Sequence, residues 1–511
     1  MPTLRLDGRS LSLDDLAPLA RGAALTVSVT KDAKAAVKRA RKLVEDHVAA
    51  GDVVYGLTTG FGKLKSVAIA TEDLETLQKN LVLSHCCGVG EPMLDEEVRI
   101  AQVLRLNGLV RGHSGVRDSL VDALVRLFNK GFTPVVPQQG SVGASGDLAP
   151  LSTMAATYMG YGKARIGGKT KTAKAALKDV GEEPIVLQAK EGLALINGTE
   201  IMKAVGVRSY LRALNLSKAA DVIASLSLEA LLGSLKPFDD RLATLKGNEG
   251  HRRTSANLRK LLEGSGVLAS HADCDRVQDP YSLRCIPQVH GSYKTAIAHV
   301  GDVLSCEINA VTDNPVIFPE TGETVSAGQF HGQPVSMVLD YLGMAACTIA
   351  NISERRIEQL VNPDLSGLPA FLTPKPGLNS GMMIAQVAAA ALASENKVLA
   401  HPASVDTVPT SANQEDHVSM GVTAARKGRQ ILDNVENVLA IELLCAAQGR
   451  EFHTELTAGT GADAAHRALR KTVKALTHDR FLQPDIEAAR ELIASGALVA
   501  AVEAAVGPLD A

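Results

Sequence analysis

The 511 residues include 53 basic and 56 acidic side chains, so the formal net charge of −3 gives no reason to expect nucleic acid or an anionic membrane as a partner. Hydrophobic residues make up 46% of the chain, whereas aromatic residues make up 3% and tryptophan is absent. A core built from Leu, Val, Ile and Ala favours long packed helices over a β-sandwich. We find no apolar signal core at the amino terminus and no apolar run of membrane-spanning length, so we expect a cytoplasmic protein.

Seven cysteines are spread over the chain without a Cys-x-x-Cys pair, and an odd number is a poor disulfide framework. We therefore expect reduced thiols at Cys86, Cys87, Cys274, Cys285, Cys306, Cys347 and Cys445. The adjacent Cys86 and Cys87 could bind a soft metal, but no second cysteine pair lies near them in sequence. The pattern favours small buried apolar residues at these two positions and no metal site.

The amino-terminal part of the sequence predicts a series of helices. Residues 31–50 place apolar side chains at helical spacing with charges on the other face, and residues 71–83 repeat this pattern. Residues 96–111 and 116–130 predict a helical hairpin. Prolines and glycines then end the helical pattern.

The rest of the chain is also predicted to be mostly helical. Residues 161–184 are rich in Lys and Gly and predict a surface excursion with short strands. Helical patterns, most of them long and apolar, follow at 205–235, 251–263, 340–361, 381–400 and 418–448, with an alanine-rich helical end at 453–511. Without a linker or repeat, we expect one mainly α unit over residues 1–511, with an amino-terminal part (1–204) followed by a long-helix bundle (205–511).

A glycine-rich stretch, Gly140-Ser-Val-Gly-Ala-Ser-Gly-Asp-Leu-Ala-Pro-Leu151, has no large side chain before Leu148. Its simplest interpretation is a tight loop. A phosphate-binding loop is excluded, because Asp147 follows Gly146 where such a loop needs Lys and then Ser or Thr. Asp147 is suited to cap a helix that begins at Leu148, which places the loop at the positive end of that helix.

Ala144, Ser145 and Gly146 also suit an internal condensation. The amide nitrogen of Gly146 forms a bond to the carbonyl carbon of Ala144, and glycine has no side chain to hinder the approach. One water is lost from the new ring and a second from Ser145, which leaves a methylidene-imidazolone. This ring is a strong electrophile, and no ordinary side chain supplies one.

The run Gly143-Ala-Ser-Gly-Asp-Leu-Ala-Pro-Leu151 resembles the motif of the aromatic amino acid ammonia-lyase family. The resemblance implies that the ring forms autocatalytically from Ala144, Ser145 and Gly146, so that no external cofactor is needed. It also implies a mainly α-helical homotetramer whose active sites are shared between subunits. The resemblance covers most of the chain and is densest from Tyr55 to Met420.

Three positions before residue 200 resemble parts of the family's active site. Tyr55 lies in a glycine-rich loop, where a partly exposed aromatic residue is the usual case. The resemblance implies a lid whose tyrosine reaches the substrate and is one of the catalytic residues. His85 follows a predicted helix, where a structural role is commoner; the resemblance places it beside the substrate's aromatic ring. Asn197 begins an Asn-Gly pair, usually a turn, and the resemblance implies contacts to the substrate carboxylate and the ring carbonyl.

Residues 277–288 contain two prolines and predict an irregular loop. Tyr281 and Arg284 could form an ordinary surface pair, but an arginine is also able to bind a carboxylate through two parallel hydrogen bonds. A tyrosine acts as a general base only where positive charge or hydrogen bonds favour its phenolate. The resemblance implies that Tyr281 is the catalytic base, that Arg284 holds the carboxylate and that Gln278 lines the pocket.

Two positions in the second half complete the predicted site. Phe330 lies between glycines, and the resemblance places it beside the electrophile. Glu415 belongs to a polar stretch that precedes a helical pattern, where on pattern alone helix caps are the usual interpretation. The resemblance makes Glu415 the residue that discriminates between substrates. A carboxylate suits the protonatable imidazole of histidine and is costly beside a phenyl ring.

Together these residues predict the non-oxidative deamination of L-histidine to trans-urocanate and ammonia, the first step of histidine degradation. The nearest alternative is a tyrosine ammonia-lyase or aminomutase of the same family, because His85 could also meet a phenol. Alternatives from other classes are a helical scaffold or anion-binding protein, in which Ser145 stays intact, and a fumarase-like lyase without a built-in electrophile. A loss of two waters per chain marks the lyases and aminomutases that build the ring. The scaffold or anion-binding protein and the fumarase-like lyase would show no such loss.

Overall fold

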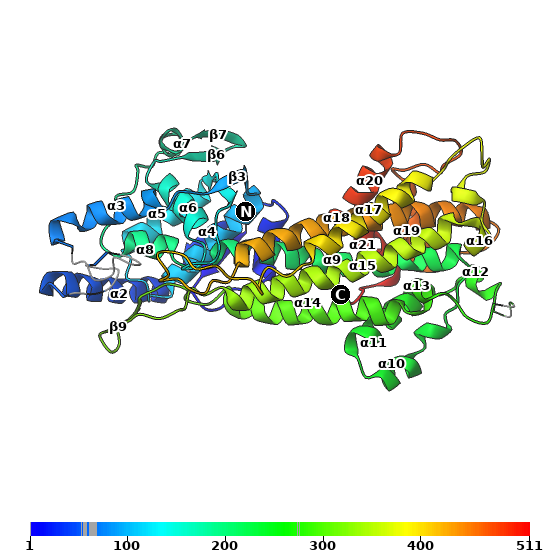
Figure 1. The fold of residues 1–511 in the computed structure, drawn as a ribbon, viewed down its shortest axis with the longest axis horizontal. Coiled ribbons are helices and arrows are strands. Elements are labelled where there is room, and N and C mark those ends of the chain that lie inside the picture. The colour runs from blue at the N-terminus through cyan, green and yellow to red at the C-terminus, as the bar shows by residue number, and fades with distance from the viewer. Residues whose placement is uncertain (1, 53, 55–58, 61–68, 273, 275) are drawn as a thin grey trace. The chain divides into compact units, whose positions relative to one another are not determined.

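The computed structural model describes residues 2–52, 54, 59–60, 69–272, 274 and 276–511 (Figure 1). Its internal contacts divide the chain into two compact units. Unit 1 comprises Met1–Arg208, Gly301–Asp340 and Pro402–Arg426, and unit 2 comprises Ser209–Val300, Tyr341–His401 and Lys427–Ala511. Most elements of both units are α-helices, so the predicted mainly α fold is confirmed.

The helices of the amino-terminal part form where the apolar side chains recur at helical spacing. They are α1 (Ala17–Ala20), α2 (Lys31–Ala50), α3 (Leu74–Ser84), α4 (Asp95–Val110), α5 (Asp118–Asn129), α6 (Leu148–Tyr158), α7 (Ala173–Asp179) and α8 (Glu191–Ile196). α2 has the predicted bounds, because Oγ1 of Thr30 accepts a hydrogen bond from the N–H of Ala33 at 3.3 Å and Gly51 ends the helix in a left-handed conformation. α4 is almost entirely buried and packs against α1, α2 and α5.

Short strands connect these helices within unit 1. β1 (Thr3–Leu6) pairs in parallel with β2 (Thr26–Val29); the antiparallel pairs are β3 (Val89–Pro92) with β5 (Pro137–Gln139), β4 (Thr133–Pro134) with β6 (Lys163–Ile166), β6 with β7 (Lys169–Thr172), and β8 (Val316–Phe318) with β9 (Glu323–Val325). The strands predicted within 161–184 are therefore confirmed, and α7 follows them as a helix that the sequence did not predict. The β3–β5 pair brings the end of α3 beside the start of the glycine-rich loop.

Four long helices run through the centre of the sequence and contribute residues to both units. They are α9 (Glu200–Ala230), α14 (Ile286–Glu307), α15 (Gln333–Val361) and α18 (Gly421–Arg450). Within unit 2, the fully buried Arg356 on α15 donates to Glu442 on α18, with Nε–Oε1 at 2.5 Å and Nη2–Oε2 at 2.9 Å. Ser227 on α9 donates to the same carboxylate at 2.7 Å. The charges buried between these helices are therefore paired and hydrogen-bonded, as burial requires.

Shorter helices complete unit 2: α10 (Asp240–Lys246), α11 (Glu249–Leu261), α12 (Gly266–Ala269), α13 (Tyr281–Arg284), α16 (Pro363–Ser366), α17 (Met383–Leu399), α19 (Thr460–Arg470), α20 (Gln483–Ala494) and α21 (Ala497–Val506). The irregular loop predicted for residues 277–288 is wrong in its second half. Pro280 precedes the single helical turn of α13, and Pro287 lies in the first turn of α14. Proline is tolerated at both positions because the first N–H groups of a helix have no intrahelical partner.

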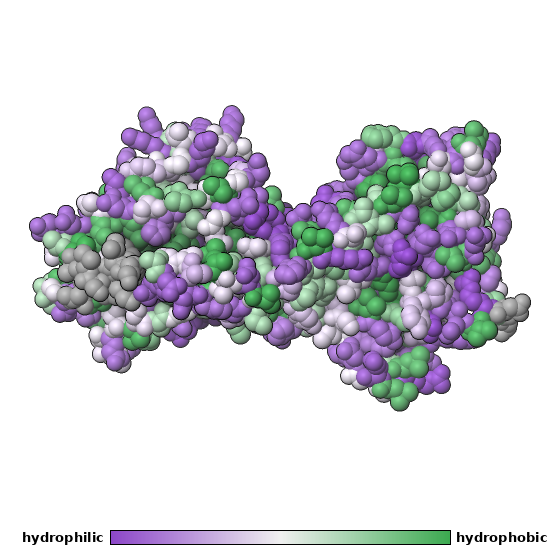
Figure 2. All heavy atoms as spheres, viewed as in Figure 1, coloured by the Kyte–Doolittle hydropathy of each residue, from purple (hydrophilic) through white to green (hydrophobic). Residues whose placement is uncertain are grey.

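On the face shown in Figure 2, hydrophilic and hydrophobic residues are interspersed. Among the residues that the structure describes, one helix, α15, is long and apolar enough to cross a membrane. Its most apolar window is 67% buried inside the fold, as is usual for a core helix.

Candidate active site

The glycine-rich loop folds back on itself at the three residues predicted to form the electrophile. Ser145 and Gly146 have φ values of 48° and 81°, and Gly143 has a φ of 91°. The N–H of Gly146 donates to the carbonyl oxygen of Gly143 at 3.2 Å, which closes a tight turn around Ala144. A non-glycine residue rarely adopts a left-handed conformation, so Ser145 is held there by its surroundings.

A second glycine turn pins this loop in place. The N–H of Gly198 donates to the carbonyl oxygen of Ser145 at 3.2 Å, and the N–H of Asp147 donates to the carbonyl oxygen of Gly198 at 2.7 Å. A Cβ atom added to Gly146 would lie 2.0 Å from that same carbonyl oxygen. Only glycine fits at position 146, because any side chain would separate the two turns.

These observations provide a test of whether residues 144–146 fit a methylidene-imidazolone. The ring joins the nitrogen of Gly146 to the carbonyl carbon of Ala144, so the chain must turn back within three residues. The left-handed Ser145 and the hydrogen bond from Gly146 to Gly143 provide that reversal. Because Gly146 has no side chain, none hinders the approach of its nitrogen to Ala144. The residues present therefore fit the group.

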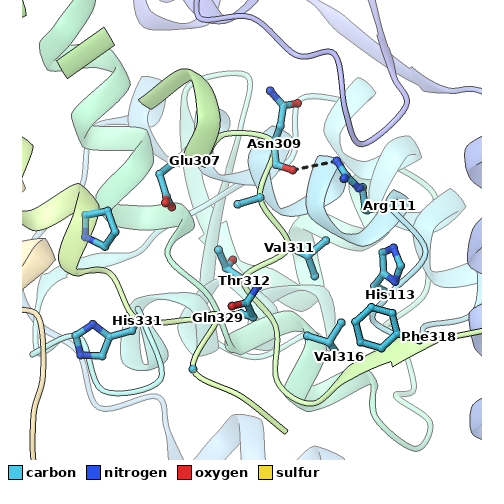
Figure 3. Close-up of a pocket in the computed structure, with 13 residues that line it drawn as sticks. Arg111, His113, Glu307, Asn309, Val311, Thr312, Val316, Phe318, Gln329 and His331 are labelled. Carbon is cyan, nitrogen blue, oxygen red and sulfur yellow. Dashed lines mark hydrogen bonds between the residues drawn. The ribbon is translucent and has the colours of Figure 1, made fainter. Parts of the chain in front are cut away.

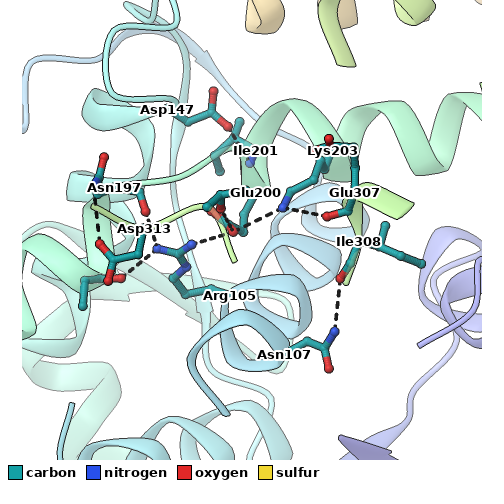
Figure 4. Close-up of polar contacts among 12 residues, drawn as sticks. Arg105, Asn107, Asp147, Asn197, Glu200, Ile201, Lys203, Glu307, Ile308 and Asp313 are labelled. Carbon is teal, nitrogen blue, oxygen red and sulfur yellow. Dashed lines mark hydrogen bonds and ion pairs between the residues drawn. The ribbon is translucent and has the colours of Figure 1, made fainter. Parts of the chain in front are cut away.

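Asp147 has a different role from the one predicted. Its side chain makes no capping hydrogen bond to α6; instead, Oδ2 accepts from the N–H groups of Ile201 at 2.8 Å and Met202 at 2.9 Å, in the first turn of α9 (Figure 4). The residue is fully buried, and desolvation outweighs these two hydrogen bonds and raises its pKa to about 7. Asp147 thus ties the glycine-rich loop, residues 140–146, to the start of α9. We call this segment the electrophile loop after its predicted role.

This raised pKa predicts a pH dependence of stability. A carboxyl with a folded pKa near 7 and an unfolded value of 3.8 stabilises the fold below pH 3.8, and this contribution is lost as the pH rises through 7. Between pH 5 and 8 we expect the free energy of unfolding of the wild type to fall by about 2–3 kcal/mol relative to Asp147→Asn. Chemical denaturation at several pH values measures the difference. The control Asp302→Asn, at an exposed position, should show the same pH dependence of the free energy of unfolding as the wild type. If Asp147→Asn also showed that dependence, Asp147 would titrate as an ordinary carboxyl.

Asn197 is buried in the turn that follows α8. Its Nδ2 donates to the carbonyl oxygen of Asn314 at 3.0 Å and lies 3.4 Å from Oδ1 of Asp313. Within the described part of the chain, its Oδ1 is buried without a hydrogen-bond partner. The side chain is therefore oriented by unit 1, and its remaining capacity is that of an acceptor.

His85 ends α3 and is half-buried. Its Nδ1 lies 2.8 Å from the carbonyl oxygen of Leu81, which only accepts, so Nδ1 carries the proton and Nε2 of the neutral ring is an acceptor. Of the two cysteines that follow, Cys86 is half-buried, and burial raises its pKa to about 11. Cys87 is exposed, so the prediction of a buried apolar residue is wrong at that position.

Glu415 lies on a segment that contacts the electrophile loop. The N–H of Met420 donates to the carbonyl oxygen of Val142 at 2.8 Å, and a Cβ on Gly143 would lie 2.2 Å from Oγ of Ser419. Glu415 itself is half-buried, and its Oε2 is buried with no hydrogen-bond partner among the described residues. A buried carboxylate oxygen without a donor is costly, so this atom is suited to a ligand that brings one.

The stretch that contains Phe330 lies against the same segment. Nε2 of His331 is 3.2 Å from the carbonyl oxygen of His417, and the two imidazole rings stack with centroids 5.7 Å apart. A Cβ on Gly332 would lie 3.1 Å from Oγ of Ser419. Phe330 is half-buried at the start of this contact. Unit 1 thus joins the electrophile loop to the segments that carry Phe330 and Glu415.

A pocket of about 440 Å³ opens beside residues 328–331 in unit 1 (Figure 3). Arg111, His113, Glu307 and Thr312 are among the residues that line it, and none of the predicted site residues does. Burial raises the pKa of Glu307. The hydroxyl of Thr312 donates to Glu200 at 2.9 Å. Gly328, Gln329 and His331 line the pocket and Phe330 does not, so the pocket adjoins the predicted site without containing it.

The other predicted residues belong to unit 2. Tyr281 is 69% exposed, and Cζ of Arg284 lies 4.4 Å from the centroid of its ring, so the guanidinium stacks on the phenol. Oδ2 of Asp279 accepts from the N–H of Ser234 at 2.7 Å and anchors the turn before α13. Gln278 is exposed on that turn. The predicted Tyr55 lies outside the described residues.

Sequence reasoning missed the buried charges that hold the site together. Arg105 donates from α4 to the carbonyl oxygen of Asn197 at 2.8 Å and pairs with Glu200 at 2.5 Å (Figure 4). The available signal was the one arginine within the largely apolar run of residues 100–110, where a charge is unexpected without a buried partner.

Known proteins are similar to this chain over almost its whole length. The family model for aromatic amino acid lyases matches residues 11–471. The histidine ammonia-lyase of Symbiobacterium thermophilum is 52% identical over 503 residues, 98% of this chain and 99% of that protein. The crystal structure of histidine ammonia-lyase from Trypanosoma cruzi aligns with a TM-score of 0.92 at 41% identity, over 99% of this chain and 96% of that one. The crystal structure of tyrosine aminomutase from Streptomyces globisporus aligns with a TM-score of 0.94 at 35% identity, over 99% of both chains. This chain belongs to the aromatic amino acid lyase family.

Proposed function

We propose that this protein is a carbon–nitrogen lyase that converts L-histidine to trans-urocanate and ammonia in the cytoplasm, as the first step of histidine degradation. The observation that carries the proposal is Glu415, whose buried Oε2 is left without a donor on a segment bonded to the electrophile loop. An imidazole N–H is a donor of the required kind. The identity of about 50% to histidine ammonia-lyases supports the same substrate.

Residues 144–146 are proposed to hold a methylidene-imidazolone and to need no external cofactor. When present, such a ring supplies the electrophile that the elimination of a poor leaving group requires. The chain's contribution is to fix its position: Gly198 binds both Ser145 and Asp147 through backbone hydrogen bonds. A preorganised site of this kind needs no rearrangement when charge develops.

The side chains of unit 1 are proposed to bind the substrate. Nε2 of His85 and Oε2 of Glu415 are both acceptors, so they are proposed to bind the two N–H groups of the protonated imidazole. Asn197 was predicted to contact the substrate carboxylate, but its free Oδ1 is an acceptor and is better suited to the amino group of the substrate. Phe330 closes the pocket. A phenyl ring carries no N–H group, so it would leave the acceptors on His85 and Glu415 without donors.

The side chains of unit 2, together with Tyr55, are proposed to complete the reaction. Arg284 binds the substrate carboxylate as a fork. Tyr281 accepts the proton of the β C–H bond, the electrons of that bond form the new double bond, and the amine leaves with the electrons of the C–N bond. Gln278 and Tyr55 exclude water from the pocket. We propose that the protein forms a homotetramer in which active sites are shared between subunits.

The main alternative is a tyrosine ammonia-lyase or aminomutase. The similarity to the tyrosine aminomutase from Streptomyces globisporus favours it on fold alone, since the TM-score there is 0.94. The acceptor on His85 could also meet a phenol hydroxyl. Glu415 separates the two functions, because a second buried acceptor has no use beside the apolar edge of a phenol.

The direct test is the absorbance of conjugated product when purified enzyme is mixed with L-histidine, L-tyrosine or L-phenylalanine. We expect absorbance to rise with L-histidine alone. A preference for L-tyrosine would retain the electrophile and overturn the substrate assignment. Silence with all three, with the mass of the intact chain showing no loss of two waters, would overturn the lyase proposal.

A further inference from the structure

Arg105 grips the turn that carries Asn197. It lies in the middle of α4 and is 3% exposed. Its Nη1 donates to the carbonyl oxygen of Ala194 at 2.7 Å and to that of Asn197 at 2.8 Å, so it holds the last turn of α8 and the residue that follows. A cation at the carboxyl end of a helix is also favoured by the partial negative charge there.

A cluster of buried charges holds the guanidinium in this position (Figure 4). Nη2 of Arg105 lies 2.5 Å from Oε1 of Glu200, which also accepts from the hydroxyl of Thr312 at 2.9 Å. Nζ of Lys203 lies 3.4 Å from the same oxygen and donates to the carbonyl oxygen of Glu307 at 3.2 Å. Burial by itself would raise the pKa of Glu200, but Arg105 and Lys203 lower it to about 2. The Glu200 carboxylate is therefore ionised at neutral pH.

The gripped turn is in direct contact with the electrophile loop. Gly198, next to Asn197, exchanges backbone hydrogen bonds with Ser145 and Asp147. A Cβ on Gly198 would lie 2.5 Å from Nη2 of Arg105 and 2.5 Å from Oε2 of Glu200. The charged pair therefore lies against one side of this glycine while the electrophile loop is bonded to it. A displacement of the pair would be transmitted to the loop through a single residue.

We propose that Arg105 is a positioning residue that holds Asn197 and Gly198 in the conformation that residues 144–146 need to form the methylidene-imidazolone. The inference rests on the proposed function. Arg105 acts through other residues and has no contact with the reacting atoms. Its planar fork reaches two carbonyl oxygens and a carboxylate at once, whereas the ammonium of lysine is a point charge without that geometry.

The test is Arg105→Lys, which keeps the charge opposite Glu200 and removes the fork. Ring content is read from the mass of the intact chain, as the fraction of folded protein that has lost two waters. We expect this fraction to fall several-fold, and kcat per chain to fall with it, while KM for L-histidine in the chains that carry the ring stays within about two-fold. A merely structural arginine would lower the melting temperature and leave the ring content of the folded protein at the wild-type value.

The matched control is Arg212→Lys in unit 2, where Nε and Nη2 of Arg212 donate to Oε1 of Glu436 at 3.1 and 2.9 Å. It removes an equivalent fork and should leave ring content unchanged. If Arg105→Lys does not fold, Arg105→Gln combined with Glu200→Gln removes both charges of this ion pair together and is measured in the same way. Full ring content and wild-type kcat in the folded variant would overturn the role of Arg105. An absence of ring and activity in the wild type would instead overturn the proposed function.

Discussion

Replacing Ser145 with alanine is expected to abolish lyase activity while leaving the fold intact. Alanine cannot lose the second water, so the exocyclic methylidene carbon never forms and the chain lacks an electrophile. Removal of an essential reacting group costs at least roughly 10³-fold in kcat. The measurement combines the rate of urocanate formation with the mass of the intact chain, which should lack the loss of two waters.

The control for this substitution is Ser152→Ala, at a buried serine on the helix that follows the loop. This control also removes one serine hydroxyl, but from a position without a proposed role. Activity and ring content should therefore stay near the wild-type values. Circular dichroism and the oligomeric state should be the same for both variants. Activity of Ser145→Ala within ten-fold of the wild type would contradict an electrophile built from this residue.

Replacing Glu415 with glutamine is expected to lower kcat/KM for L-histidine by about 10- to 100-fold, because a hydrogen bond to a charged group contributes roughly 1.5–3 kcal/mol. Glutamine has nearly the same size, so the pocket keeps its shape and loses the charge. The loss should be larger for L-histidine than for L-tyrosine, since the imidazole is the polar, protonatable ring of the two. Initial rates with both substrates measure the change in preference.

Asp416 provides a matched control one residue further along the chain. It is exposed, whereas Glu415 is half-buried and its Oε2 has no partner within the described residues. Asp416→Asn removes one negative charge from the same segment and should change kcat/KM by less than about two-fold. Equal losses in the two variants would show that the charge of the segment, and not a contact with the imidazole, sets the rate.

Helix positions could be predicted because helical periodicity is a local property. Residues 31–50 form α2 with the predicted bounds, and residues 205–235 lie largely within α9. The error at Pro287 has a local cause as well. Proline ends a helix in its interior but is accepted in a first turn, and the sequence does not show on which side of a proline the helix lies.

The role of Asp147 shows where local reasoning fails. Its place immediately before α6 predicts a cap for that helix, yet its carboxylate binds the first N–H groups of α9. Both helix starts offer unpaired N–H donors, and either could satisfy one carboxylate. The choice depends on which helix start the carboxyl group faces in the folded chain. Packing decides this, and the neighbouring residues do not encode it.

The proposed electrophile could be predicted from the sequence alone, because Ala144, Ser145 and Gly146 are adjacent in the chain and the proposed ring would join covalent neighbours. The assignment of His85 and Glu415 to the substrate ring stays a prediction, which rests on the family resemblance and on the hydrogen-bonding capacity of the two side chains. Only the tertiary structure shows which buried side chains hold the residues of the proposed site in position. Arg105, Asn197 and Glu200 come from separate helices and turns, and their contacts exist because buried charges must find partners wherever packing places them.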